Sequence, residues 1–190
     1  MSLGWHSTDS IEKMGWICGY CGKSVGGNTG FYRIEKGDLQ RIYICPKCEK
    51  PTAFVYDDNH VIVQIPGEPY GNNVESLPES VETLYSEVRR CIQHTSYTAA
   101  VLAMRKLLMH VAVDCGAKEN LPFVKYVDYL DENHYITPNA KDWADTLRTY
   151  GNDATHQIVI MDEADAKQLL DFAEMMLKIV YEFPNKQRKR

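Results

Sequence analysis

The sequence lacks a hydrophobic run long enough to cross a membrane, and it lacks the features of a secreted precursor. Its longest uncharged stretch, residues 91–104, is broken by Gln93, His94, Thr95 and Ser96, whereas a membrane helix needs about 18 apolar residues. The opening residues carry neither the basic start nor the apolar core of a signal peptide. We therefore expect a cytoplasmic protein with no membrane association.

An excess of positive charge is also missing. The chain has 21 Lys and Arg against 26 Asp and Glu, a net charge of −5. Residues 1–65 are neutral, residues 66–185 carry ten basic and nineteen acidic side chains, and residues 186–190 add +4. Such a chain has no overall field that attracts nucleic acid. Any nucleic-acid contact must come from a local patch in the N-terminal region or from the basic tail.

Several enzyme signatures are absent. No Glu-x-x-His pair suggests a catalytic metal, and the Gly-rich stretch at residues 26–30 lacks the Lys and the helix of a phosphate-binding loop. The composition, 44% hydrophobic and 25% charged, is that of a globular protein. At 190 residues the chain is long enough for one ordinary domain or two small ones.

Four of the six cysteines form two Cys-x-x-Cys pairs that are separated by 23 residues. The two-residue gap lets both thiolates of a pair point at one ion, and four thiolates in tetrahedral geometry suit Zn²⁺. A glycine, Gly22, follows the first pair, where a left-handed backbone is commonly needed. We predict one structural Zn²⁺ per chain, in a closed site without a position for substrate; the alternatives are disulfides and an iron–sulfur cluster. The predicted ligands are Cys18, Cys21, Cys45 and Cys48.

Short segments around these pairs have the composition of β-strands. They are residues 31–34, 41–44, 53–56 and 61–65, and the predicted turns are Gly26-Gly27-Asn28, Lys36-Gly37-Asp38 and Asp57-Asp58-Asn59. The order of pairs and strands resembles a zinc ribbon over residues 14–65, which implies a small β domain at residues 1–65. So small a unit cannot bury enough apolar area alone, so zinc would supply much of its folding free energy.

One face of this ribbon is a candidate nucleic-acid surface. Strand alternation places Arg41 and Tyr43 on one side, and Arg33 is expected to share it. Aromatic and guanidinium groups side by side can stack bases and hold phosphates, so these three residues are candidate RNA- or DNA-binding residues. The alternative, favoured by the neutral charge of the region, is that this face packs on the helical region or on a protein partner.

Beyond residue 65 the sequence changes character. Residues 66–77 carry two Pro and two Gly and are predicted to be a linker, after which apolar residues recur with a helical period. Helices are predicted at 78–95, 96–115, 122–133, 138–151 and from Asp162 to Pro184, which is expected to stop the last one. The prediction is an α+β protein, with an all-α bundle of four or five helices at 78–184 and a basic tail at 185–190.

The segment before the last helix carries Arg148, Gly151, Asn152 and His156 in the order Arg-x-x-Gly-Asn-x-x-x-His. This order resembles domain-of-unknown-function family 4145 over residues 78–184, and a zinc ribbon ahead of the domain fits that family too. Where the family often has Arg-x-x-Leu-Glu, this chain has Met109 in place of the acid, four residues after Arg105. Further matching motifs are Asp165-Ala166, Leu169-Leu170 and Tyr181-Glu182-Phe183-Pro184.

That family is similar to the HEPN (higher eukaryote and prokaryote nucleotide-binding) helical domains, many of which are metal-independent ribonucleases. The resemblance implies that His156 exchanges protons with the RNA, that Arg148 neutralises transition-state charge, and that Asn152 orients the imidazole or binds phosphate. HEPN ribonucleases usually have a shorter spacing than the seven residues between Arg148 and His156. The alternative is structural: Arg148 pairs with Asp145, and the other two residues belong to a helix boundary.

Two functions therefore stand as hypotheses. The first is a binding or adaptor protein that recognises a nucleic acid or a protein partner, with phage or phage-defence biology as a candidate setting. The second is an endoribonuclease that uses Arg148 and His156. We also expect a homodimer joined through the helical domain, because a two-fold axis would bring two copies of a sparse Arg/His site together.

Overall fold

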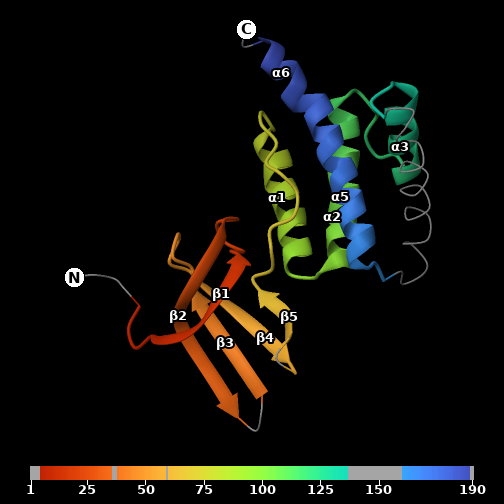
Figure 1. Ribbon diagram of the computed structural model, residues 1–190. Helices are drawn as coiled ribbons and strands as arrows, with labels where there is room; N and C mark the ends of the chain where they lie inside the picture. The colour runs from red at the N-terminus through yellow and green to blue at the C-terminus, as the bar shows by residue number, and fades with distance from the viewer. Residues whose placement is uncertain (1–4, 36–37, 59, 137–159, 189–190) are drawn as a thin grey trace. The chain divides into compact units, whose positions relative to one another are not determined.

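The structure, a computed structural model, describes residues 5–35, 38–58, 60–136 and 160–188. The chain divides into two compact units, Met1–Pro69 and Tyr70–Arg190. The first unit is an antiparallel β-sheet and the second is helical, which confirms the predicted α+β class (Figure 1). Within the described ranges, no helix combines the length and the apolar character that a bilayer crossing requires.

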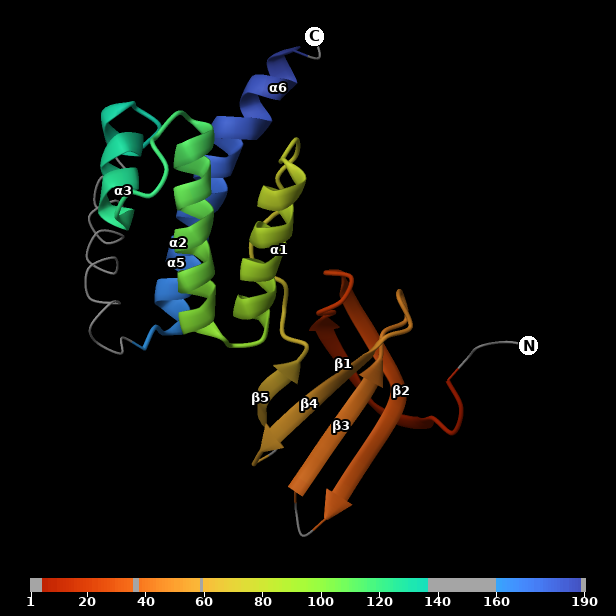
Figure 2. The ribbon, with the colours of Figure 1, turned by 180° about the vertical axis from the view of Figure 1, so that it is seen from behind.

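The sheet has five strands in the order β1-β2-β3-β4-β5, and each pairs antiparallel with its neighbour in the sequence (Figure 2). Consecutive antiparallel strands place the β1–β2 and β3–β4 connections at one end of the sheet and the two other hairpins at the opposite end. All four predicted strand segments lie in β2 to β5. The strands are β1 Asp9–Ile17, β2 Ser24–Glu35, β3 Asp38–Ile44, β4 Pro51–Asp57 and β5 His60–Ile65.

The first half of the sheet corrects the sequence analysis. Strand β1 was not predicted, and the predicted turn Gly26-Gly27-Asn28 lies inside β2. Gly27, from the predicted turn, and Gly30, further along the strand, allow close packing within the sheet. A Cβ on Gly27 would lie 3.1 Å from the Trp16 ring, and one on Gly30 would lie 1.9 Å from the carbonyl oxygen of Ile42. Glycine therefore lets the backbone of β2 pass directly under an indole and against β3.

An aromatic cluster forms the core of the sheet unit. Along β4 the buried residues alternate, as period-2 geometry requires, and Phe54 is one of them. Its ring centroid lies 5.6 Å from that of Tyr43 and 6.0 Å from that of Trp16. The Tyr43 hydroxyl donates a 2.8 Å hydrogen bond to the carbonyl oxygen of Glu12, so β1 lies over the face that carries these rings.

The helical unit is built on α1, α2, α3 and α5 (Figure 1). Their apolar faces meet in one buried cluster, and α2 contributes to it along its length, as expected of a central helix. The predicted helices at 78–95, 96–115 and 122–133 are present; the one predicted at 138–151 lies outside the described residues. The bounds are α1 Glu79–Gln93, α2 Tyr97–Asp114, α3 Phe123–Glu132 and α5 Glu163–Leu177.

The last helix begins as predicted but does not end as predicted. Asp162 is its N-cap and forms a capping box with Asp165. Pro184 does not stop the helix: α5 runs into a π-helical stretch, Lys178–Glu182, and then into α6, Phe183–Arg188. A proline ring clashes with the carbonyl four residues earlier in an α-helix. For Pro184 that carbonyl belongs to Val180, which lies in the wider π-helical stretch, and the conflict is thereby relieved.

Residues 70–75, here called the strap, are bound to the helical unit. Arg89 of α1 donates hydrogen bonds to the carbonyl oxygens of Tyr70 (2.9 Å) and Gly71 (2.8 Å) and to the Asn73 side chain (2.7 Å). Gly71 has φ +75°, and a Cβ there would lie 2.9 Å from Leu170. Within the predicted linker, this stretch is therefore an ordered part of the second unit.

Candidate metal centre

Two short loops at one end of the sheet carry the four predicted zinc ligands. Knuckle 1 (residues 18–23) joins β1 to β2, and knuckle 2 (residues 45–50) joins β3 to β4. In each loop the first cysteine amide donates to the carbonyl five residues later, at 3.0 Å in both cases, and its carbonyl accepts the amide four residues later, at 2.8 and 2.9 Å. The two loops thus repeat one backbone fold, and each presents two cysteines.

The residue after the second cysteine of each loop has a left-handed backbone. In knuckle 1 this residue is Gly22, with φ +64°, as predicted. In knuckle 2 the equivalent residue is Glu49, with φ +57°, a conformation that costs a residue with a Cβ about 1–2 kcal/mol. Glycine therefore forms this turn without strain in knuckle 1, whereas in knuckle 2 a glutamate adopts the same unfavourable backbone conformation.

The four sulfur atoms converge. All lie within 4.8 Å of one another, with 3.7 Å between the Sγ atoms of Cys18 and Cys48 and 3.9 Å between those of Cys21 and Cys45. Tetrahedral zinc with Zn–S bonds of about 2.3 Å requires S···S separations of about 3.8 Å. The spacing fits a four-thiolate metal site, and all six cysteines of the chain are free thiols.

The pKa values of the clustered thiols indicate that a cation would stabilise their ionised forms. Burial raises the pKa of the Cys18 thiol, but hydrogen bonds from the amides of Cys21 and Tyr20 and from neighbouring thiols outweigh it and bring the pKa to about 7. Burial raises the pKa of Cys48 to about 12, and the adjacent thiols add to the effect. Four thiolates this close cannot all ionise unless a positive ion balances them. The cluster is therefore suited to a metal such as zinc.

The three candidate nucleic-acid residues do not form one face. Arg33 pairs across the strands with Gln40, whereas Arg41 pairs with Tyr32 and Phe54. Cross-strand partners share a face of the sheet, so Arg33 lies on one face and Arg41 and Tyr43 lie on the other. The expectation that Arg33 shares their face is wrong. A shift of one residue in register moves a side chain to the other face, and only the pairing in the folded sheet reveals it.

Two of these residues are also engaged inside the sheet unit. Tyr43 is 0% exposed and belongs to the aromatic core. The Arg41 side chain is 17% exposed, lies over the Tyr56 ring and forms a 2.6 Å ion pair with Glu12. A role of Arg33, Arg41 or Tyr43 in nucleic-acid binding stays a prediction, and the structure does not bring them together as one surface.

The knuckle loops hold side chains that the sequence analysis passed over. Tyr20 and Lys47 occupy equivalent positions, two residues after the first cysteine of each loop, and Lys23 and Lys50 occupy the equivalent positions five residues after it. The Lys50 ammonium lies 5.0 Å from the centroid of the Tyr20 ring. The equal spacing of these residues from the first cysteine of each loop is the feature of the sequence that could have identified them.

The predicted catalytic residues Arg148, Asn152 and His156 lie outside the residues that the structure describes. Upstream, the Arg105 guanidinium of α2 lies 4.7 Å from the Phe123 ring centroid, and burial lowers its pKa. Met109 is partly buried against the helical core, so an apolar side chain occupies the position where the resembled family often has an acid.

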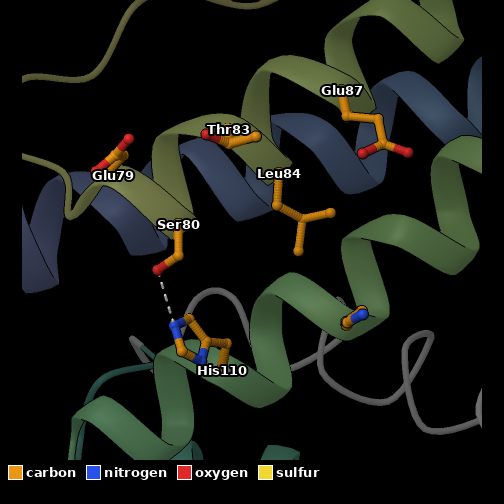
Figure 3. A pocket seen from close by; sticks show the side chains of 7 residues that line it. Glu79, Ser80, Thr83, Leu84, Glu87 and His110 are labelled. Carbon is orange, nitrogen blue, oxygen red and sulfur yellow. Dashed lines mark hydrogen bonds between the residues drawn. The ribbon is translucent and has the colours of Figure 1, made fainter.

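A cavity of about 590 Å³ lies between α1 and α2, and the sequence analysis did not find it (Figure 3). Ser80 and His110 point toward one another there, with 3.3 Å between Oγ and Nε2, and Leu84 extends into the space between the helices. An activated serine needs its base oriented by a third group, and the His110 imidazole makes no other hydrogen bond among the described residues. The full lining is Glu79, Ser80, Thr83, Leu84, Glu87, Lys106 and His110.

Comparison with known proteins bears on the helical unit. Residues 86–190 match the family described as Domain of unknown function (DUF4145). No curated protein and no solved structure was found to match the chain. The family match covers α2, α3 and α5 and the predicted catalytic segment, and it spans more than half of the chain. This protein therefore belongs to the DUF4145 family of domains of unknown function.

Proposed function

We propose that this protein is a cytoplasmic binding module, in which a zinc-ribbon sheet unit is joined to a HEPN-like helical domain. The observation that carries the proposal is the closed set of four convergent thiols. A zinc ion held by four thiolates has no open coordination position, so it can stabilise a fold but cannot bind substrate or activate water. The metal centre is then structural, and the sheet unit acts through its surface.

The surface of the sheet unit supports a binding role. Edge strand β5 contains no Asp, Glu, Lys or Arg and exposes Ile62 (59%) and Ile65 (50%). Natural edge strands are usually protected by charge or proline, so an apolar edge favours association. At the end of the sheet, the lysines of the knuckles form a second exposed feature. Neither feature is a catalytic constellation.

Metal removal tests the structural role of zinc. The purified protein is expected to contain about one zinc per chain, and Cys45→Ser is expected to lose it because three thiolates cannot close the site. Chelation should unfold the sheet unit, whose core is small, while the helical signal in circular dichroism persists. The matched control is Cys115→Ser, which lies outside the cluster and should leave the zinc content unchanged.

The binding role is tested by capture of partners from a cell extract. Zinc-loaded protein should retain a partner that the Cys45→Ser variant does not, because the variant has no ordered sheet unit. A metal-free protein with a folded sheet, or a zinc-dependent catalytic turnover, would contradict the proposal.

The alternative function is a metal-independent endoribonuclease that uses Arg148, Asn152 and His156. It is supported by the family match, because the matched residues include all three. A histidine suits proton exchange near neutral pH, and an arginine suits a phosphate or its transition state. Such a site would be completed by a second copy of the chain in a homodimer.

A further inference from the structure

One end of the sheet unit carries a group of exposed lysines, although the unit is close to neutral in total. The knuckle end carries Lys23, Lys47 and Lys50, all exposed. Among the described residues, none of these three ammonium groups pairs with a carboxylate, in contrast to Arg41 on β3. At the opposite end, the hairpin between β4 and β5 contains the acidic residues Asp57 and Asp58.

An exposed aromatic ring accompanies these lysines. Tyr20 is 50% exposed and lies outside the aromatic core of the sheet, yet the Lys50 ammonium is 5.0 Å from its ring centroid. Tyr20 belongs to knuckle 1 and Lys50 to knuckle 2. The two side chains meet because both loops converge on the four-cysteine cluster. A half-exposed ring beside ammonium groups is the combination that stacks an unpaired base and holds the neighbouring phosphates.

We propose that the knuckle end, defined by Tyr20, Lys23, Lys47 and Lys50, binds single-stranded nucleic acid. This inference rests on the proposed function and names the class of partner. The ring selects single strands over duplexes, because bases within a duplex are already stacked. The lysines act on the sugar–phosphate backbone and confer no sequence preference.

The metal centre limits the affinity of this surface. Zinc with four thiolates carries a formal charge of −2, and Glu49 and Glu68 add acidic groups to the loops and to the segment after β5. The three lysines offset only part of this negative charge, so the net attraction of the surface for a polyanion is weak. We therefore expect dissociation constants of about 10⁻⁴ to 10⁻⁶ M, typical of binding without sequence specificity.

The experiment is fluorescence anisotropy of the zinc-loaded, full-length protein with labelled oligo-dT, oligo-U and a duplex of mixed sequence. With three phosphate contacts, the logarithm of the binding constant should fall with the logarithm of salt concentration with a slope of about −2. Lys23→Gln/Lys47→Gln/Lys50→Gln should bring this slope close to zero. Tyr20→Ala should weaken binding about tenfold and Tyr20→Phe should bind like the parent, because the ring is what stacks.

Lys13→Gln is the matched control, since it removes one exposed lysine from β1, away from the knuckles, and should leave affinity within about twofold. Zinc content verifies that each variant keeps its metal centre. Binding that is unchanged in both the Tyr20→Ala and the triple variant, or equal affinity for the duplex, would overturn the inference. Zinc-dependent capture of a protein from nuclease-treated extract, without oligonucleotide binding, would overturn it while leaving the proposed binding module intact.

Discussion

At the scale of single residues, the buried carboxylate of Glu174 joins the strap to α5. It accepts hydrogen bonds from the backbone amide (2.7 Å) and the side-chain amide (3.0 Å) of Asn72 and from the Tyr85 hydroxyl (3.2 Å), and it pairs with Lys178. Burial would raise its pKa, but Lys178 and Asn72 outweigh that effect and hold the pKa of the carboxyl below its ordinary value. The carboxylate thus fastens the strap to α5.

Replacement of this carboxylate should destabilise the helical unit. Glu174→Gln removes one partner of a buried ion pair, and we expect it to lower the free energy of unfolding by about 2 kcal/mol at neutral pH. Because the folded pKa is depressed, the stabilisation is present above the ordinary carboxyl pKa of 4.5 and is lost as pH falls through the lower folded value. Denaturant unfolding followed by circular dichroism measures both effects.

The variant should therefore differ from the parent at pH 7 and converge with it in acid. Glu87→Gln, an exposed carboxylate of α1, is the control and should change stability by less than about 0.5 kcal/mol. A parent and a Glu174→Gln variant with parallel pH profiles would show that the carboxylate is not what fastens the strap.

At the scale of elements, the start of α5 shows how a local motif defines a helix boundary. The Asp165 amide donates a 2.9 Å hydrogen bond to Asp162 Oδ1, and the Asp162 amide donates in return to Asp165 Oδ2 at 3.4 Å. Both carboxylates also lie near the positive end of the helix dipole. Neither interaction depends on the rest of the fold, so this boundary was predictable from the sequence.

Loss of this cap should be measurable. Asp162→Ala is expected to cost about 1 kcal/mol of stability, because it leaves the Asp165 amide without an acceptor. Asp162→Asn keeps an acceptor oxygen and should recover most of the loss. Thermal unfolding of the parent and the two variants measures these differences. If Asp162→Asn were as unstable as Asp162→Ala, the negative charge near the helix dipole, and not the capping hydrogen bond, would stabilise this helix end.

At the scale of the whole molecule, one chain contains two units of different secondary structure. The sheet unit buries a small aromatic core and carries at one end the four-cysteine cluster, which is compatible with metal binding. The helical unit buries a much larger apolar cluster. Small β units gain stability from metals because their cores are too small, which is why the two units should respond differently to chelation.

The oligomeric state and the ribonuclease alternative can be tested together. Size-exclusion chromatography with light scattering should give about twice the mass of one chain if the helical domains pair as expected. In that case His156→Ala should abolish RNA cleavage in the presence of a chelator, because the proton-transfer group is lost. A monomer at micromolar concentration, or no cleavage by the parent protein, would remove the composite-site argument and leave the binding function.

The sequence alone determined the features that depend on local spacing. The two Cys-x-x-Cys pairs placed four thiols, helical periodicity located α1, α2 and α3, and Asp162 marked the start of α5. Each of these rests on residues within one or two turns of one another, so no knowledge of distant contacts was needed. Gly22 followed the same logic, because the left-handed turn after a cysteine pair is a local requirement.

Only the tertiary structure decided the features that depend on residues far apart in the chain. The register of β2 against β3 put Arg33 on the face opposite Arg41, and the Trp16 ring explains Gly27 within a strand. Partners a hundred residues away fasten Asn72 to α5, and the convergence of the two knuckles brings Lys50 over Tyr20. Strand register and long-range packing are set by the energy of the whole fold, which no local window of sequence contains.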